Sequence, residues 1–317
     1  MNRIGCFLRD MLLIRRIEYR IAEIPIVAIP VLLMNPDMAA FKALPLWEGV
    51  LIFFLLFAFG DMINCLADRD LDAIYKPHLS KAVYNLGVPF VTFQVVLTAV
   101  AALLVAAHLA WTLQRWHLLT LVASGIVLGA AYSVEPVRLK GRGLWQIACL
   151  WSIIFFGPMV FIASLFDVVP SIPVTIFAAA YGLMQMGIIL VNTAEDYPED
   201  RDAKIRTSIV SLGLHRGIAL ANALFLAGGL GVAVTLLVLF WPQRATLYCG
   251  ALIPALAAYA FVARRIWQLH RSITGQELET SIAAVKRSAK NVPIWVTAVA
   301  WSSCGAVLAL FLARHVA

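Results

Sequence analysis

Long apolar runs are the feature that most restricts how this chain folds. Hydrophobic residues make up 62% of its 317 residues and charged residues only 14%, and its mean hydropathy is +0.86. A soluble domain of this size does not need so many apolar residues to form its core, so the composition indicates an all-α, polytopic membrane protein. We expect nine transmembrane helices in one bundle, at residues 16–34, 47–67, 88–111, 118–132, 144–165, 172–194, 217–241, 246–267 and 292–312.

The basic residues are divided unevenly between the two sides of this bundle. Nine spans place the two chain ends on opposite sides of the membrane. Only four of the 25 Lys and Arg residues then fall on the side of the C-terminus. The positive-inside rule makes the other side, with the N-terminus, cytoplasmic. The net charge of +7 therefore reflects membrane topology, and we expect no nucleic-acid partner. The four residues are Lys42, Arg115, Arg244 and Arg314.

A polar stripe ends the second predicted span. Asn64, Asp68 and Asp72 follow one another at intervals of four residues, with Lys76 four residues further on. Each such step turns a helix by only about 40°, so the three side chains lie on one face. Stacked carboxylates repel one another unless a cation lies between them, and charges that emerge from a membrane span indicate function. The alternative is a polar helix end that passes into a solvated loop. After the stripe we expect a loop that runs to residue 87.

The same spacing returns 128 residues later, at Asn192, Asp196, Asp200 and Lys204. A pattern repeated after an apolar run predicts an internal duplication. The repeats are expected to be parallel, because both stripes then lie at the same membrane face. We treat residues 1–317 as one transmembrane domain.

The cytoplasmic loops are expected to form a cap over the bundle. Within the last of these loops, residues 275–290 are compatible with an amphipathic interfacial helix and equally with an ordinary solvated helix. The predicted repeats cover residues 16–143 and 144–290, and the last helix follows at 292–312.

The two stripes and the loop between spans four and five suggest a phosphate chemistry. Mg²⁺ prefers carboxylate oxygens and is usually completed by a substrate phosphate. Arg138, Lys140 and Arg142 in that loop suit a diphosphate, and metals with cations neutralise the charge on a departing diphosphate. The apolar bundle suits an isoprenoid tail. In the first span, Arg20 either pairs with Glu23 or contacts substrate.

Three motifs in this order resemble those of the UbiA-type intramembrane prenyltransferase superfamily, and the resemblance covers the whole chain. The first is Asn-x3-Asp-x3-Asp, at 64–72; Asp61, one turn earlier, is an unexpected additional carboxylate. The second is Asp-x3-Asp, at 196–200. The third is the basic loop, matched by Tyr132, Ser133, Pro136, Arg138, Lys140 and Gly143.

The resemblance implies Mg²⁺-dependent ionisation of an allylic isoprenoid diphosphate and transfer of the prenyl group to an aromatic or other lipid-pathway acceptor. It implies that Asp68, Asp72, Asp196 and Asp200 bind metal and are catalytic. The residues expected to assist or to bind the diphosphate are Asn64, Asn192, Tyr132, Arg138, Lys140 and Lys204, with Arg20 and Lys76 as further candidates.

Two other functions remain open from the residues. A terpene cyclase of the same superfamily would use the same ionisation and capture the cation within its own prenyl chain. A cation-coupled transporter would use the duplicated carboxylates as an ion path. Transporters usually carry such charges near the membrane midplane, often in inverted repeats, which disfavours this alternative.

Overall fold

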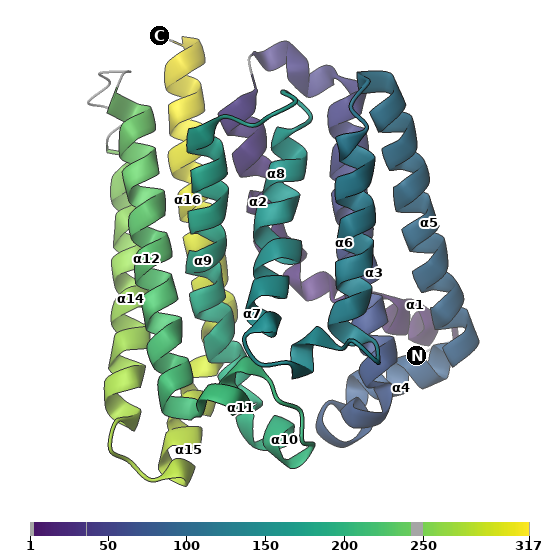
Figure 1. Ribbon diagram of the computed structural model, residues 1–317, viewed down its shortest axis with the longest axis vertical. Helices are drawn as coiled ribbons and strands as arrows, with labels where there is room; N and C mark the ends of the chain where they lie inside the picture. Colours follow the sequence, from purple (N-terminus) through teal and green to yellow (C-terminus); the bar gives the residue numbers. More distant parts are fainter. Residues whose placement is uncertain (1–2, 36, 242–249, 317) are drawn as a thin grey trace. The chain divides into compact units, whose positions relative to one another are not determined.

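The computed structural model describes the chain except for residues 1–2, 36, 242–249 and 317. Among the described residues the secondary structure is helical and no strand forms, which confirms the expected all-α class (Figure 1). Within this described part of the chain, six stretches are long and apolar enough to cross a membrane. They are Leu44–Tyr75, Val88–Leu113, Trp145–Ala163, Ile172–Glu195, Leu214–Phe240 and Val292–Arg314.

The nine-span count stays a prediction. Of the three other expected spans, α2 (Arg20–Met34) is 15 residues long with two internal prolines, and α6 (His117–Ser133) has 17 residues. The helix α14 covers Leu252–Ile273, whereas the expected start of that span at 246 and the counted Arg244 lie outside the described residues.

The chain divides into two compact units, which we describe separately. The first comprises Met1–Arg20 and Phe41–Leu139, and the second comprises Ile21–Ala40 and Lys140–Ala317. The single-domain organisation and the internal repeats remain predictions. The helices of the first unit are α1 (Arg3–Leu13), α3 (Leu44–Tyr75), α4 (Pro77–Leu86), α5 (Val88–Leu113) and α6, with the short 3-10 turn η1 (Ile17–Tyr19).

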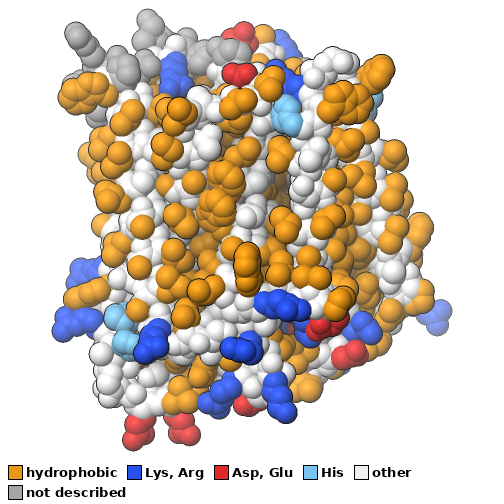
Figure 2. All heavy atoms as spheres, in the orientation of Figure 1, with side chains coloured by type: hydrophobic (Ala, Val, Ile, Leu, Met, Phe, Trp, Pro, Cys, Tyr) orange, Lys and Arg blue, Asp and Glu red, His pale blue; other side chains and the backbone are white. Residues whose placement is uncertain are grey.

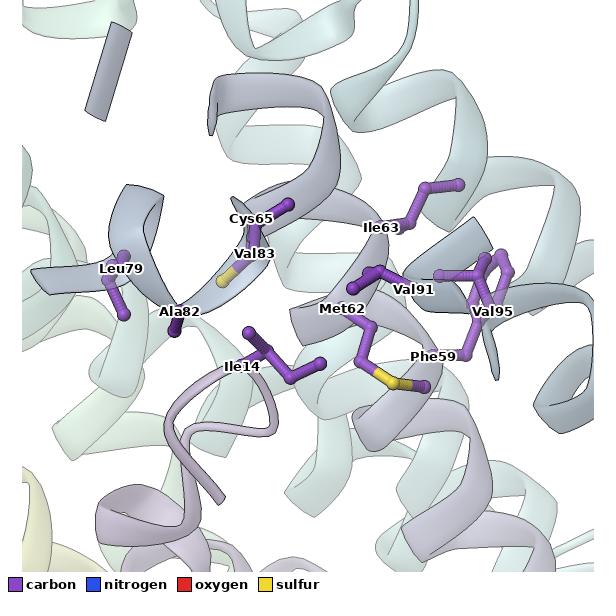
Figure 3. Close-up of a cluster of buried hydrophobic side chains, with 10 residues drawn as sticks. All are labelled: Ile14, Phe59, Met62, Ile63, Cys65, Leu79, Ala82, Val83, Val91 and Val95. Carbon is purple, nitrogen blue, oxygen red and sulfur yellow. The ribbon is translucent and has the colours of Figure 1, made fainter. Parts of the chain in front are cut away.

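In the first unit, the segment expected to be a loop before Gly87 is the helix α4. Pro77 begins this helix, where its missing N–H costs no hydrogen bond. Leu79, Ala82 and Val83 recur at helical spacing and are buried. Figure 3 shows them in one cluster with Ile14 and with side chains of α3 and α5, including Met62 and Val91. The loop expectation was wrong because this apolar face, only ten residues long, gives a weak periodic signal.

The second unit contains most of α2 and the helices from α7 onward. A π-helical stretch, η4 (Trp151–Phe156), joins α7 (Trp145–Leu150) to α8 (Gly157–Ala163), so the fifth expected span is continuous. The remaining helices are α9 (Ile172–Glu195), α10 (Tyr197–Asp202), α11 (Ser208–Leu212), α12 (Leu214–Phe240), α14, α15 (Leu278–Ala289) and α16 (Val292–Val316).

Glycines allow α9 and α12 to pack closely. A Cβ added at Gly228 of α12 would lie 2.2 Å from the backbone nitrogen of Met184 and 2.5 Å from the carbonyl oxygen of Ala180, both in α9. A Cβ at Gly187 of α9 would lie 2.6 Å from the carbonyl oxygen of Ala221. Small residues let helix backbones approach in membranes, where van der Waals packing rather than water exclusion drives association.

The surface agrees with a membrane protein. On the face drawn in Figure 2, hydrophobic side chains cover the long helices along their length, whereas charged side chains gather toward their ends. Together with the six apolar stretches, this pattern supports an integral, multi-pass membrane protein, as predicted.

Candidate active site

The first motif lies on a single helix. α3 continues without a break to Tyr75, so Asn64, Asp68 and Asp72 form the helical stripe that their spacing predicted. Asp72 is buried and the Asp68 side chain is only 12% exposed. Ser133 of α6 donates a hydrogen bond from Oγ to Asn64 Oδ1 at 3.3 Å. The stripe therefore contacts α6 and is not a solvent-exposed helix end.

Arg138 of the basic loop reaches this stripe. Its guanidinium lies 3.2 Å from Asp68 Oδ1 and 3.1 Å from Glu135 Oε1. Its backbone has a φ of +37°, in the left-handed region, which costs a residue with a Cβ roughly 1–2 kcal/mol. Such strain persists where the surroundings hold the residue. Here the N–H of Arg138 donates to the carbonyl oxygen of Val134 at 2.9 Å, and its guanidinium contacts the two carboxylates. Arg138, a cation suited to bind a diphosphate, is thus in direct contact with Asp68, a carboxylate suited to bind a metal.

Arg20 also approaches the first motif, through Asp61. Its guanidinium donates to Asp61 Oδ2 at 2.7 Å and to the carbonyl oxygen of Arg15 at 2.6 Å. Asp61 precedes Asn64 by about one helical turn on α3. The additional carboxylate of the first motif therefore has a structural partner, and a contact of Arg20 with substrate stays a prediction.

Two further candidates are placed by the ends of helices. Lys76 caps the C-terminus of α3, where its N–H donates to the carbonyl oxygen of Asp72 at 2.8 Å. Tyr132 lies half-buried in the last turn of α6, directly before Ser133. Lys76 is therefore hydrogen-bonded to the first motif. Tyr132 is the sequence neighbour of Ser133, which is hydrogen-bonded to Asn64.

The second motif has the same spacing but a different backbone. Asn192 lies on α9, Asp196 stands at the break between the helices, and Asp200 lies on α10. Pro198 has no N–H for the carbonyl of Ala194, and its ring would clash with that carbonyl in a continuous helix. The chain turns at Asp196, whose carbonyl oxygen accepts from the N–H of Asp200 at 2.8 Å. The residue spacing is therefore the same in both motifs, but only the first motif lies on one continuous helix.

The basic candidates of the second unit lie in tight segments. Lys204 follows α10 with a left-handed φ of +58° and an exposed side chain. Lys140 lies in the short 3-10 turn η3 (Leu139–Gly141) and is buried, with 7% of its surface exposed. A buried lysine requires compensating groups, which makes Lys140 the more constrained of the two cations.

Hydrogen bonds join the segment after the basic loop to the segment after the second motif. The N–H of Gly143 donates to the carbonyl oxygen of Arg206 at 2.7 Å. Gln146 Oε1 accepts from both the N–H and the Oγ of Ser208, each at 2.8 Å, and both residues are buried. Sequence reasoning missed Gln146 and Ser208, because a lone amide and a lone hydroxyl carry no spacing signal.

The donors suit a hard divalent cation by their chemistry, since they are carboxylate and amide oxygens. Within the described part of the chain, however, no three His, Cys, Asp or Glu side chains converge on one point. The first unit brings together Asn64, Asp68 and Arg138, and the second brings Asp196 next to Asp200. A complete ligand set for a metal stays a prediction.

Fold and site together define a polytopic helical membrane protein with acidic and basic side chains where its helices end. The sequence model of the UbiA prenyltransferase family matches residues 24–277, and the chain belongs to this family. The predicted resemblance is thereby confirmed.

Two curated relatives match parts of the chain. The bacteriochlorophyll synthase 33 kDa chain of Rhodobacter capsulatus is 28% identical over 179 residues, which are 51% of this chain and 56% of the relative. Homogentisate phytyltransferase of Synechocystis sp. is 29% identical over 157 residues, 48% of this chain and 49% of the relative. The chain thus spans about half the length of these two relatives.

The fold also matches a solved structure. A UbiA homolog from Archaeoglobus fulgidus, bound to GPP and Mg²⁺, superposes with a TM-score of 0.62 over 93% of this chain and 99% of that chain. The sequences are 16% identical, so the likeness shows a shared fold.

Proposed function

We propose that this protein is an integral-membrane prenyltransferase. It ionises an allylic isoprenoid diphosphate with Mg²⁺ and transfers the prenyl group to an aromatic or other lipid-pathway acceptor. The observation that carries the proposal is the 3.2 Å contact between Arg138 and Asp68. It places a cation suited to phosphate beside a carboxylate suited to metal, at the end of an apolar helix.

In this proposal Asp68, Asp72, Asp196 and Asp200 hold Mg²⁺, assisted by Asn64 and Asn192. Bound Mg²⁺ supplies positive charge that stabilises the departing diphosphate. The chain's cations bind the same group: Arg138 and Lys140 of the basic loop and Lys204 after the second motif, with Tyr132, Arg20 and Lys76 as further contacts. Arg138 is suited to this role because its planar guanidinium offers paired donors to phosphate oxygens.

Arg138 has two binding partners in this account. Its guanidinium contacts Asp68 and Glu135. When metal neutralises Asp68, we expect the guanidinium to bind the diphosphate, which is the stronger acceptor. The contacts with Asp68 and Glu135 already order the Arg138 side chain, so that less side-chain entropy remains to be lost on binding.

The relatives support the class of substrate. One is named a phytyltransferase for homogentisate, and the solved homolog was bound to GPP and Mg²⁺. The apolar helices that carry both motifs suit a prenyl tail, which favours an isoprenoid rather than a nucleotide diphosphate. The membrane is a partner of the protein in this account, and the acceptor is a second small molecule.

The test is a metal-removal experiment on the purified protein in lipid nanodiscs. Diphosphates of several chain lengths are supplied with and without candidate aromatic acceptors, and products are separated by mass spectrometry. We expect EDTA to abolish prenyl transfer and Mg²⁺ to restore it. Undiminished transfer in EDTA would exclude the metal role. A cyclised hydrocarbon formed without acceptor would favour a terpene cyclase instead.

A further inference from the structure

An ion pair connects the short helix α10, which carries Asp200, to the helix α15, which lies within the segment 275–290. Lys286 Nζ of α15 lies 2.8 Å from Glu199 Oε1 of α10. Glu199 directly precedes Asp200 on α10, and the N–H of Asp200 donates to the carbonyl oxygen of Asp196 at 2.8 Å. The ion pair therefore acts on the same turn as the second carboxylate motif.

The packing of α15 fixes the backbone position of Lys286. Ser281, Val285 and Ala289 recur every four residues on one face and are all buried. α15 packs against α9, the helix that leads into the second motif. Lys286 follows Val285 directly, so its backbone is fixed by this packing although 44% of its side chain is exposed. Ordering the lysine therefore costs less than on a loose surface helix.

Lys286 is placed to compensate a strongly acidic segment. Five acidic residues lie between 195 and 202. The hydrogen bond to Glu199 raises the pKa of Lys286, and the charges of Glu199, Glu195 and Asp196 raise it further against the effect of burial. Glu199 Oε2 is enclosed and has no hydrogen-bond partner in the described part of the chain. Removing Lys286 would leave this carboxylate without its cation.

We propose that Lys286 is a positioning residue: by holding Glu199, it fixes α10 and thereby the Asp196 and Asp200 pair for metal binding. The inference rests on the proposed function of these two aspartates. α10 has six residues and joins α9 across the break at Asp196, so its orientation needs an external tie. If α10 is ordered only part of the time, the apparent metal affinity falls by that fraction.

Binding of Mn²⁺ tests the inference without relying on turnover. Free Mn²⁺ is counted by electron paramagnetic resonance in titrations of full-length protein in nanodiscs. Lys286→Met and Glu199→Gln each break the pair, and Lys286→Arg restores the charge. Arg287→Met is the matched control, because Arg287 is an exposed neighbour on α15 whose loss removes the same charge. Thermal melts report on folding of each variant.

We expect Lys286→Met to weaken Mn²⁺ binding about fivefold, the effect of losing up to roughly 1 kcal/mol from a half-exposed pair. Glu199→Gln should weaken it similarly, and the double variant no more than either single one. Lys286→Arg and Arg287→Met should bind like the wild type. The same shift should appear in the Mg²⁺ concentration for half-maximal turnover, with turnover at saturating Mg²⁺ largely kept.

Two failures are distinguishable. If the wild type binds Mn²⁺ and Lys286→Met binds it equally well or more tightly, the positioning role is refuted while the proposed function stands. If Arg287→Met weakens binding as much as Lys286→Met, the effect is one of general charge and the specific pair is refuted. If the wild type binds no Mn²⁺ and transfers no prenyl group, the proposed function itself fails.

Discussion

Replacing Gly228 by alanine is expected to destabilise the pair formed by α9 and α12. The added methyl would lie 2.2 Å from a backbone nitrogen of α9, whereas ordinary contacts begin at 3.4 Å. Because the obstacle is backbone, the helices must separate locally by about 1 Å, and a gap of that size forfeits up to roughly half of the dispersion energy of the affected contacts. We expect a net loss of about 1–3 kcal/mol.

The neighbouring Gly229 is the matched control. A Cβ there would meet only the sulfur of Met184, at 3.6 Å, which is ordinary contact. Gly229→Ala should therefore be neutral or stabilise α12 by about 0.5 kcal/mol, because alanine loses less backbone entropy than glycine.

The assay is a thermal melt of each purified variant in the same detergent or nanodisc. Gly228→Ala should melt on the order of 5 °C below the wild type, and Gly229→Ala at or slightly above it. Two results would contradict this reasoning: a Gly228→Ala variant that melts at the wild-type temperature, or an equal fall in melting temperature for both variants. Either would show that the close approach of the two backbones does not limit stability.

Two further predictions concern the basic loop and the topology. Arg138→Ala should lower turnover by about 10–100-fold, the effect of losing a charge-assisted hydrogen bond of roughly 1.5–3 kcal/mol. Arg138→Lys should lower turnover by a smaller factor. Normal turnover of folded Arg138→Ala would show that Arg138 is not part of the site. Reporter fusions at both chain ends should place the N-terminus in the cytoplasm and the C-terminus on the opposite side, whereas two ends on one side would show that the count of nine spans is wrong.

The sequence predicted well whatever depends on local periodicity. Apolar runs placed the long helices, and the stripe Asn64, Asp68 and Asp72 lies on one helix because α3 has no breaker between these residues. The same rule failed at Asp200, because Pro198 outweighs the spacing and breaks the helix at Asp196. A pattern of polar residues thus predicts a shared helix face only when the residues between them permit the helix.

Contacts between distant segments had no signal in the sequence. Lys286 and Glu199 are 87 residues apart and meet only through the packing of α15 on α9. Arg138 was identified from its motif, but its left-handed backbone and its contact with Asp68 are consequences of tertiary structure. Such pairings depend on how helices pack, which residue spacing along one chain does not encode.

The most direct test of the central claim is the turnover of Asp68→Asn, Asp196→Asn and the double variant. If both motifs hold metal around one diphosphate, neither works alone, and each single variant should lose at least about 10²-fold in turnover, since several kcal/mol of transition-state stabilisation disappear. The double variant should be scarcely worse than either, because groups that act as one unit are not additive.

Asp70→Asn and Asp202→Asn are the controls: Asp70 lies on α3 with Asp68, Asp202 lies on α10, which begins directly after Asp196, and both carboxylates are largely exposed, at 72% and 65%. They should keep near-normal turnover, and all variants should melt like the wild type. Near-normal turnover of folded Asp68→Asn or folded Asp196→Asn would contradict the account, because one motif would then be dispensable.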